Sequence, residues 1–203
     1  MQRIATACCV LLLLMAGAVS AQAPAAPTQR IRGEAVALDG LSLQIKSRTG
    51  EIITVKLAET YTVTAVVKID IDHIVPGAFV GAASMPQPDG TQRALEVLVF
   101  PESRRGSGEG HYPWDLQPGS MMTNATVADV VKVDKDRRMT LKYKDGEKTV
   151  LVPADVPIVT FEPGERAMLK PGAHLLLTAT RQPDGSLTAG GVAVGKDGLV
   201  PPM

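Results

Sequence analysis

The residues most able to do chemistry lie in one segment near the middle of the chain. His111, Tyr112, Trp114 and Asp115 fall close together, and Trp114 is the only tryptophan of the sequence. An aromatic ring beside polar groups suits a ligand platform, and binding residues concentrate in loops. A structural alternative is that Trp114 and Leu116 staple the segment onto a folded domain. The segment is therefore the first candidate for a binding site, with a staple as its alternative.

Soft side chains suggest a second chemistry for the same segment. Thioether and imidazole groups suit Cu(I), and Met121 and Met122 follow His111 with Trp114 between them. These residue types are similar to those of a small periplasmic OB-fold chaperone for copper and silver. In this chain the ligands would come from a linker, and their spacing differs from that pattern. A copper-type site of His111, Met121 and Met122 is the resulting hypothesis.

A hydrolase is the third hypothesis for this region, with Glu109, His111 and Asp115 as its polar groups. The sequence has no G-x-S-x-G, P-loop, G-x-G-x-x-G or H-E-x-x-H motif to supply a nucleophile, phosphate cradle or zinc site. The glycine-rich run 106–110 contains no lysine and is typical of a flexible linker. We therefore expect no catalytic residue and no cofactor.

The first residues have the pattern of a Sec-type signal peptide, with Arg3 before a short apolar run and small residues after it. The prediction is a leader over 1–21, cleaved near Ala21 or Ala23, followed by a Pro/Ala tether over 22–29. The apolar run is shorter than the roughly 20 residues that span a bilayer. The sequence thus predicts a periplasmic or secreted protein with no integral membrane segment in the mature chain.

Cysteine content and net charge further limit the kinds of site and partner that the sequence allows. Both cysteines, Cys8 and Cys9, lie in the predicted leader, so the mature chain would have no disulfide and no thiolate ligand. Lys and Arg number 21, as do Asp and Glu. A balanced charge gives no long-range attraction for nucleic acid, so we expect no nucleic-acid partner.

Short strings recur along the mature chain at a fixed distance. Pro-Gly-Ala at 76–78 returns at 171–173, and Gln-Pro-Asp-Gly at 87–90 returns at 182–185, both 95 positions later. Two matches at one offset and in one order indicate an internal duplication.

Each copy has the residue pattern of β-structure. Alternation of apolar and polar residues over 41–46 and 139–144 is typical of half-buried strands. The longer connections 65–75 and 160–170 each suggest a short helical turn between strands three and four. The predicted fold class is all-β, with two tandem five-stranded OB-like barrels; a single continuous β-sandwich is the alternative. The predicted divisions are an OB-like domain over 30–100, a linker over 101–123 and a second OB-like domain over 124–203.

The order of these motifs resembles a family of bacterial secreted OB-like domains of unknown function. The first copy carries the resemblance at Gly33, Val36, Gly50-Glu51, Val63-Thr64, Pro76-Gly77 and Pro88-Asp89-Gly90. The second carries it at Gly146-Glu147, Val159-Thr160, Pro171-Gly172 and Pro183-Asp184-Gly185, with Asn124 or Ala125 in place of the first glycine. The resemblance implies a fold and a compartment and no activity, because glycine and proline here shape turns.

These patterns together predict a non-catalytic binding or scaffold protein of the bacterial envelope. Its partner would be an envelope protein, a peptide or a glycan, since barrels of this kind offer faces and loops for extended ligands. Metal binding through the linker, hydrolysis and a purely mechanical spacer are the alternatives. Within the linker, His111, Tyr112, Trp114 and Asp115 are the predicted ligand contacts.

Overall fold

The structure, a computed structural model, describes residues 26–202. These residues form twelve β-strands and short 3-10 turns, with no α-helix among them. The predicted leader 1–21 and its cleavage points lie outside the described residues, as does the first half of the predicted tether, whose last two residues already belong to the first strand. The strands are β1 (Thr28–Asp39), β2 (Ser42–Ser47), β3 (Ile52–Lys68), β4 (Phe79–Pro86), β5 (Gln92–Val99), β6 (Gly110–Pro113), β7 (Met121–Val133), β8 (Asp136–Tyr143), β9 (Gly146–Val152), β10 (Ile158–Pro163), β11 (His174–Arg181) and β12 (Leu187–Gly195).

One group of strands closes into a five-stranded barrel, called the first barrel below. β1 pairs with β2 and β11, β2 pairs with β3, and β12 pairs with both β11 and β3. Tight turns join its hairpins at the predicted places, with Gly40 and Gly185 at positive φ, where glycine is favoured. The all-β prediction is confirmed by this barrel.

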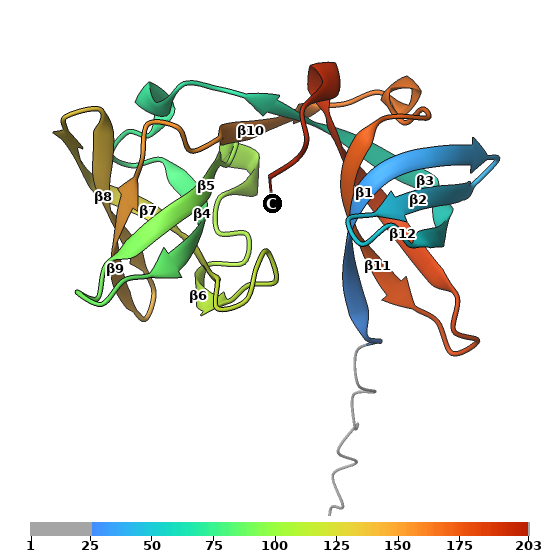
Figure 1. The fold of residues 1–203 in the computed structure, drawn as a ribbon, viewed down its shortest axis with the longest axis horizontal. Helices are drawn as coiled ribbons and strands as arrows, with labels where there is room; N and C mark the ends of the chain where they lie inside the picture. The colour runs from blue at the N-terminus through green and yellow to red at the C-terminus, as the bar shows by residue number, and fades with distance from the viewer. Residues whose placement is uncertain (1–25, 203) are drawn as a thin grey trace, which may run out of the picture.

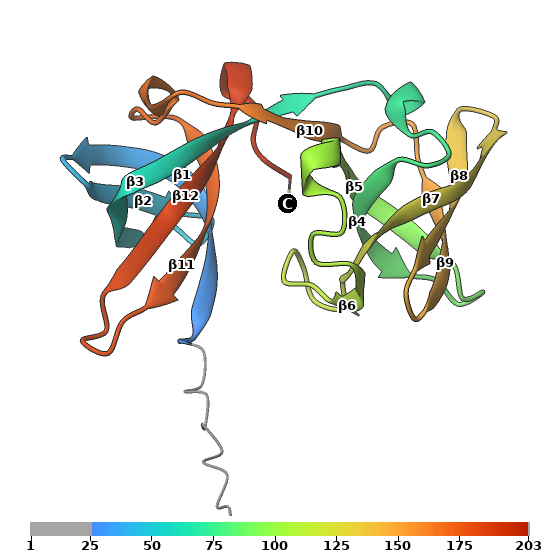
Figure 2. The same cartoon turned by 180° about the vertical axis from the view of Figure 1, so that it is seen from behind.

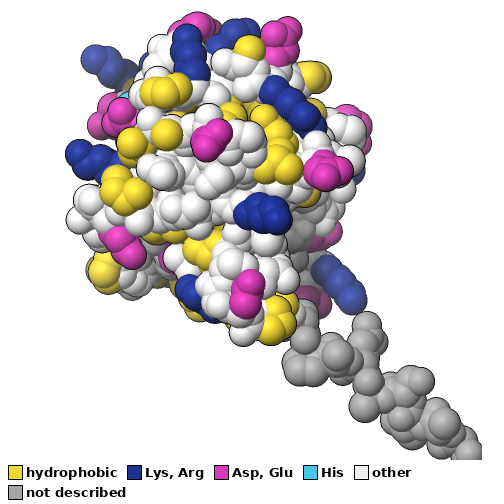
Figure 3. Space-filling view, turned by 90° about the vertical axis from the view of Figure 1, so that its right-hand side faces the viewer, with side chains coloured by type: hydrophobic (Ala, Val, Ile, Leu, Met, Phe, Trp, Pro, Cys, Tyr) yellow, Lys and Arg dark blue, Asp and Glu magenta, His cyan; other side chains and the backbone are white. Residues whose placement is uncertain are grey.

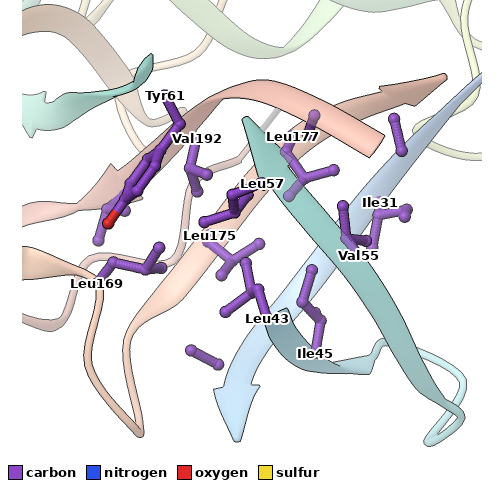
Figure 4. Close-up of a cluster of buried hydrophobic side chains, with 14 of the residues drawn as sticks. Ile31, Leu43, Ile45, Val55, Leu57, Tyr61, Leu169, Leu175, Leu177 and Val192 are labelled. Carbon is purple, nitrogen blue, oxygen red and sulfur yellow. The ribbon is translucent and has the colours of Figure 1, made fainter. Parts of the chain in front are cut away.

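The core of the first barrel follows from the period-2 pattern of its strands. Leu43 and Ile45 of β2 and Val55 and Leu57 of β3 all point inward and are almost completely buried. Figure 4 shows them converging with side chains from β1, β11 and β12. Each such side chain contributes about 1.5–3 kcal/mol when fully buried, so this cluster dominates the stability of the barrel.

The remaining long strands form a second ring of pairings, called the second barrel. β7 pairs with β8 and β4, β8 with β9, β4 with β5, and β5 with β9 in parallel. Its interior is a separate apolar cluster that includes Val97, Val127, Met139 and Leu141. β6 adds to the outer edge of β7, and β10 lies between β3 and β5.

Neither barrel is built from one contiguous half of the chain. The first barrel takes β1 to β3 from the N-terminal half and β11 and β12 from the C-terminal half. The second takes β4 and β5 from the N-terminal half and β7 to β9 from the C-terminal half. The prediction that 30–100 and 124–203 each form a barrel is therefore wrong in its connectivity: the two segments exchange their last two strands.

In the N-terminal half, β3 runs without a break through this exchange. Residues 57–63, Leu-Ala-Glu-Thr-Tyr-Thr-Val, contain no glycine or proline and favour extended backbone, so β3 does not turn back after leaving β2. Its C-terminal part, Thr64–Lys68, instead runs antiparallel to β10, and these two strands bridge the barrels (Figures 1 and 2). Beyond the bridge, β4 and β5 reach the second barrel.

Short 3-10 turns follow each bridging strand. They span Ile71–His73 after β3 and Arg166–Met168 after β10. Both lie in the connections where a helical turn was predicted, and both precede a Pro-Gly pair, so this part of the prediction is confirmed. Further 3-10 turns span Glu102–Arg104 and Lys196–Gly198.

The pairing pattern repeats under a shift of 95 positions. Val97 pairs with Ile158, and Val192 pairs with Val63. At the middle of the bridge, Val66 pairs with Phe161, which is itself 95 positions further on. The strand pairings on the two sides of the bridge are therefore related by the same shift of 95 positions.

The barrels meet at a small apolar cluster beside the bridge. Val66, Leu98 and Val159 are buried there, and Leu176 and Ala193 of the first barrel pack against them. The C-terminal segment ends in the space between the barrels (Figure 1). On the outer side of the first barrel, acidic and basic side chains alternate with scattered apolar ones, without a single-sign patch (Figure 3).

Candidate functional site

The predicted linker is mostly an ordered part of the second barrel. Its residues 110–113 form β6, which pairs antiparallel with the start of β7: His111 lies opposite Thr123 and Tyr112 opposite Met122. Side chains of directly opposite residues share a face of the ribbon, and neighbours along a strand point to opposite faces. The segment thus presents two different sets of side chains, one on each face.

His111 lies on the face that turns toward the second barrel. Its Nδ1 is 2.8 Å from the Thr123 hydroxyl, and its ring stacks on Tyr143 with centroids 6.4 Å apart. Burial, followed by the nearby Lys148 ammonium, lowers the pKa of His111 below its ordinary value. The imidazole is therefore neutral at neutral pH and packs as part of the barrel.

The proposed copper ligands do not converge. Met122 shares its face with Tyr112 and is buried there, while His111 points to the other face. Met121 lies opposite Pro113, on the same face as His111, so at most two of the three side chains share a side of the ribbon. Over residues 26–202, no group of three or more His, Cys, Asp or Glu side chains is placed to hold a metal ion.

The proposed hydrolytic residues are also held apart by different partners. Glu109 Oε1 accepts a hydrogen bond from the Lys144 backbone N–H at 3.0 Å. His111 contacts Thr123, and Asp115 contacts the first barrel. No two of the three are bonded to each other, so the structure does not bring them together as an acid–base set.

Tyr112 and Trp114 lie on the face that turns toward the first barrel. The guanidinium of Arg30, on β1, lies 3.7 Å from the centroid of the Trp114 ring, and Tyr112 packs edge-on to that ring at 6.1 Å. The Tyr112 hydroxyl accepts a hydrogen bond from Asn124 Nδ2 at 3.2 Å, and burial raises the pKa of Tyr112. Arg30 thus already covers the expected ligand platform.

Asp115 completes this contact between the barrels. Its Oδ1 is 3.1 Å from Arg30 Nη1 and 2.8 Å from Arg32 Nη2. Burial acts to raise the pKa of Asp115, but the hydrogen bonds and positive charges of the two arginines outweigh it and lower the pKa. The linker therefore joins the second barrel to β1 through a charged contact and a cation–π contact.

Sequence reasoning missed Glu96, the most unusual ionisable group of the described chain. It lies on β5, is fully buried, and neither carboxyl oxygen has a hydrogen-bond partner. Burial raises the pKa of Glu96 to about 8, although Arg32 and Arg48 of the first barrel act to lower it. The carboxyl therefore keeps its proton near neutral pH. Its signal in the sequence is one acid inside the apolar run Ala94–Phe100.

A hollow opens beside this group at the edge of the first barrel, and we call it the junction hollow. Its volume is about 260 Å³. Three cations, Arg32, Lys46 and Arg48, line it together with Glu34, His174, Gly33, Ser47, Leu175, Val200 and Pro201. Arg48 Nη2 makes a long hydrogen bond of 3.5 Å to the Pro201 carbonyl oxygen. The hollow can therefore offer hydrogen-bond donors to a negatively charged group.

No family model, curated protein or solved structure matches this chain. Across the residues that the structure describes, none of the helices has the length and apolar character to span a membrane. The junction, meaning the contact between the barrels with Glu96, Asp115 and the hollow, is accordingly the candidate site on geometric grounds alone.

Proposed function

We propose that this chain is a non-catalytic binding or scaffold protein of the bacterial envelope. The observation that carries the proposal is the junction hollow: an open, cationic hollow beside a contact that fixes the two barrels. The three residues expected for hydrolysis do not meet: His111 contacts Thr123, Glu109 accepts from the Lys144 N–H, and Asp115 pairs with Arg30 and Arg32. A hollow with convergent polar groups is a candidate binding site.

The envelope location is proposed from the leader pattern over 1–21, and it has a direct test. Export would remove the leader near Ala21 or Ala23, so the mature protein isolated from a bacterial periplasm should have the mass of a chain beginning at residue 22 or 24. A full-length protein retained in the cytoplasm would contradict this part of the proposal.

We further propose that the two halves arose by duplication of one OB-like unit of the secreted family that the motifs resemble. The repeated strings at an offset of 95 support this, as does the repeat of strand pairing under the same shift. Ala125 of β7 pairs with Val80 of β4, and Gly33 of β1 pairs with Leu175 of β11. Because Leu175 is 95 positions after Val80, Ala125 corresponds to Gly33. The exchange of strands then lets each copy complete the barrel of the other.

The binding function is tested by a ligand screen that also follows the fate of each ligand. Envelope peptides and glycans are added to the mature protein, unfolding temperatures are recorded, and every stabilising compound is analysed by mass spectrometry after prolonged incubation. The proposal expects stabilisation with the compound recovered intact. Conversion of a compound by this protein, and not by a heat-denatured sample, would overturn it.

A further inference from the structure

We propose that the junction hollow binds a small oxyanion group, a carboxylate or a phosphate, with Arg48 as its main ligand and Arg32, Lys46 and His174 around it. The inference rests on the proposed binding function and adds the chemical class of the ligand. It follows from the charges, the free donors and the shape of the hollow.

Arg48 supplies donors that the fold leaves unused. A guanidinium has five N–H groups, and the one protein hydrogen bond of Arg48 is the long contact to Pro201. Among the ion pairs of residues 26–202, none includes Arg48. A guanidinium matches the two oxygens of a carboxylate or phosphate in a bidentate contact, which is among the stronger hydrogen-bonded pairs.

The local charge is unbalanced toward positive. Burial and the neighbouring Arg32 both lower the pKa of Arg48, which indicates that two guanidiniums are close to each other. Asp115 is shared between Arg30 and Arg32, and Glu96 keeps its proton near neutral pH because of its burial. Glu96 and Asp115 act to raise the pKa of Arg48, but burial and Arg32 outweigh them, so an anion in the hollow would stabilise this guanidinium further.

Backbone geometry keeps the hollow open. Gly33 lies where a Cβ would come within 2.1 Å of the Lys46 carbonyl oxygen, so only glycine allows β1 and β2 to approach there. The buried Pro201 forms the opposite rim together with Val200. With about 260 Å³, the hollow accepts an oxyanion and part of the molecule that carries it.

The second barrel differs from this site at the position of Arg32. Asn124 pairs with Gly81 as Arg32 pairs with Leu176, which is 95 positions after Gly81, so Asn124 corresponds to Arg32. Lys144 stands two residues before the Gly-Glu pair at 146–147, as Arg48 does before the pair at 50–51. Asn124 Nδ2 donates hydrogen bonds to the Ser107 carbonyl oxygen and the Tyr112 hydroxyl of the linker. Lys142 and Lys144 keep the charges of Lys46 and Arg48, so Arg32 is the cation of the hollow that the second barrel replaces by an uncharged residue, and the fold does not require it.

The test is a titration of the 15N-labelled mature protein, followed by 1H–15N correlation spectra. Inorganic phosphate and acetate are the probes, and sodium chloride at the same ionic strength is the reference. We expect saturable shifts of the Gly33, Ser47 and Arg48 amides, and an affinity about tenfold weaker in Arg48→Gln. Lys144→Gln, in the matching turn of the second barrel, should bind like the wild type.

Saturation by phosphate alone supports a phosphate-bearing ligand, and saturation by acetate supports a carboxylate. Shifts no larger than those in chloride, or equal affinity in Arg48→Gln, overturn the inference. Lys46→Gln provides a second variant on the same rim, with a smaller loss expected. If the ligand screen succeeds while these titrations show nothing, the oxyanion site fails and the binding function stands. If the screen shows conversion of a compound while phosphate or acetate saturates the hollow, the non-catalytic function fails and the oxyanion site stands.

Discussion

The pH dependence of stability gives a sharp test of the junction, because Glu96 carries a proton there that it would lose in the unfolded chain. Its pKa is about 8 in the folded protein, against an ordinary value of 4.5. Between these values the folded state binds one more proton than the unfolded state, so the free energy of unfolding falls as pH rises. The contribution is complete below pH 4.5 and is lost as pH rises through about 8. At about 1.36 kcal/mol per pKa unit, the wild type should lose roughly 3 kcal/mol between about pH 5.5 and about pH 8.5.

Glu96→Gln keeps the volume of the side chain and removes its titration. Urea unfolding at several pH values should show that this variant lacks the loss of stability seen in the wild type. The lowered pKa of His111 acts in the opposite direction, since stability from a neutral buried imidazole is lost as pH falls below 6.5. The free energy of unfolding of Glu96→Gln should therefore stay constant, or rise slightly, as pH rises. The exposed Glu147→Gln is the control and should keep the wild-type slope.

Parallel slopes in the wild type and in Glu96→Gln would refute this reasoning. They would show that the carboxyl is ionised in the folded protein, with Arg32 and Arg48 fully offsetting its burial. The charges that face Glu96 are those two guanidiniums, with Asp115 acting on Arg48 from the linker. The two outcomes differ by roughly 3 kcal/mol, which is well above the error of a urea midpoint.

Three further predictions concern the contact between the barrels and the strand exchange. Trp114→Ala should lower the free energy of unfolding by about 2 kcal/mol, and a double-mutant cycle with Arg30→Ala should give a coupling of about 0.5–1 kcal/mol; a coupling of zero would remove the cation–π contact as a cause. Asp115→Asn should cost about 1 kcal/mol, because its side chain is 48% exposed, and the cost should shrink in high salt; a cost independent of salt would contradict an electrostatic role. Fragments 26–105 and 106–202, produced separately, should not form compact monomers by light scattering but should combine in a 1:1 complex, since each barrel needs strands from both; a compact, cooperatively unfolding monomer of either fragment would contradict the exchange.

The sequence predicts local structure well because local structure depends on nearest neighbours. The period-2 runs at 41–46 and 139–144 are strands, and the Pro-Asp-Gly turns close hairpins. The β3 strand was not predicted at its full length, since a strand that turns and a strand that continues have the same alternation. The lack of glycine and proline in 57–63 keeps β3 continuous, but the corresponding segment after β9 contains Pro153 and Pro157 and also leaves its barrel, so this signal does not predict the exchange.

The residue types of the linker single it out in the sequence, but they do not reveal which residues it contacts. Trp114 and Asp115 do lie at the junction, yet they face Arg30 and Arg32, which are about 80 positions away in the sequence. No local pattern connects the two groups, because the contact depends on how the barrels sit against each other. His111 shares the segment but points to the opposite face, which a one-residue change in register would reverse.

The differences between the two halves locate the candidate site better than their similarities do. Positions that match across the halves, such as the Pro-Gly and Asp-Gly pairs, shape turns that both barrels need. Two charged residues of the junction have no charged equivalent: Glu96 corresponds to Gly191 under the shift of 95, and Arg32 to Asn124 through the strand register. A contact that served only to hold two equivalent barrels together could use equivalent residues from each, and here it does not. This asymmetry supports a function of the junction other than holding the barrels together. The charges that line the hollow fit the proposed binding of an oxyanion.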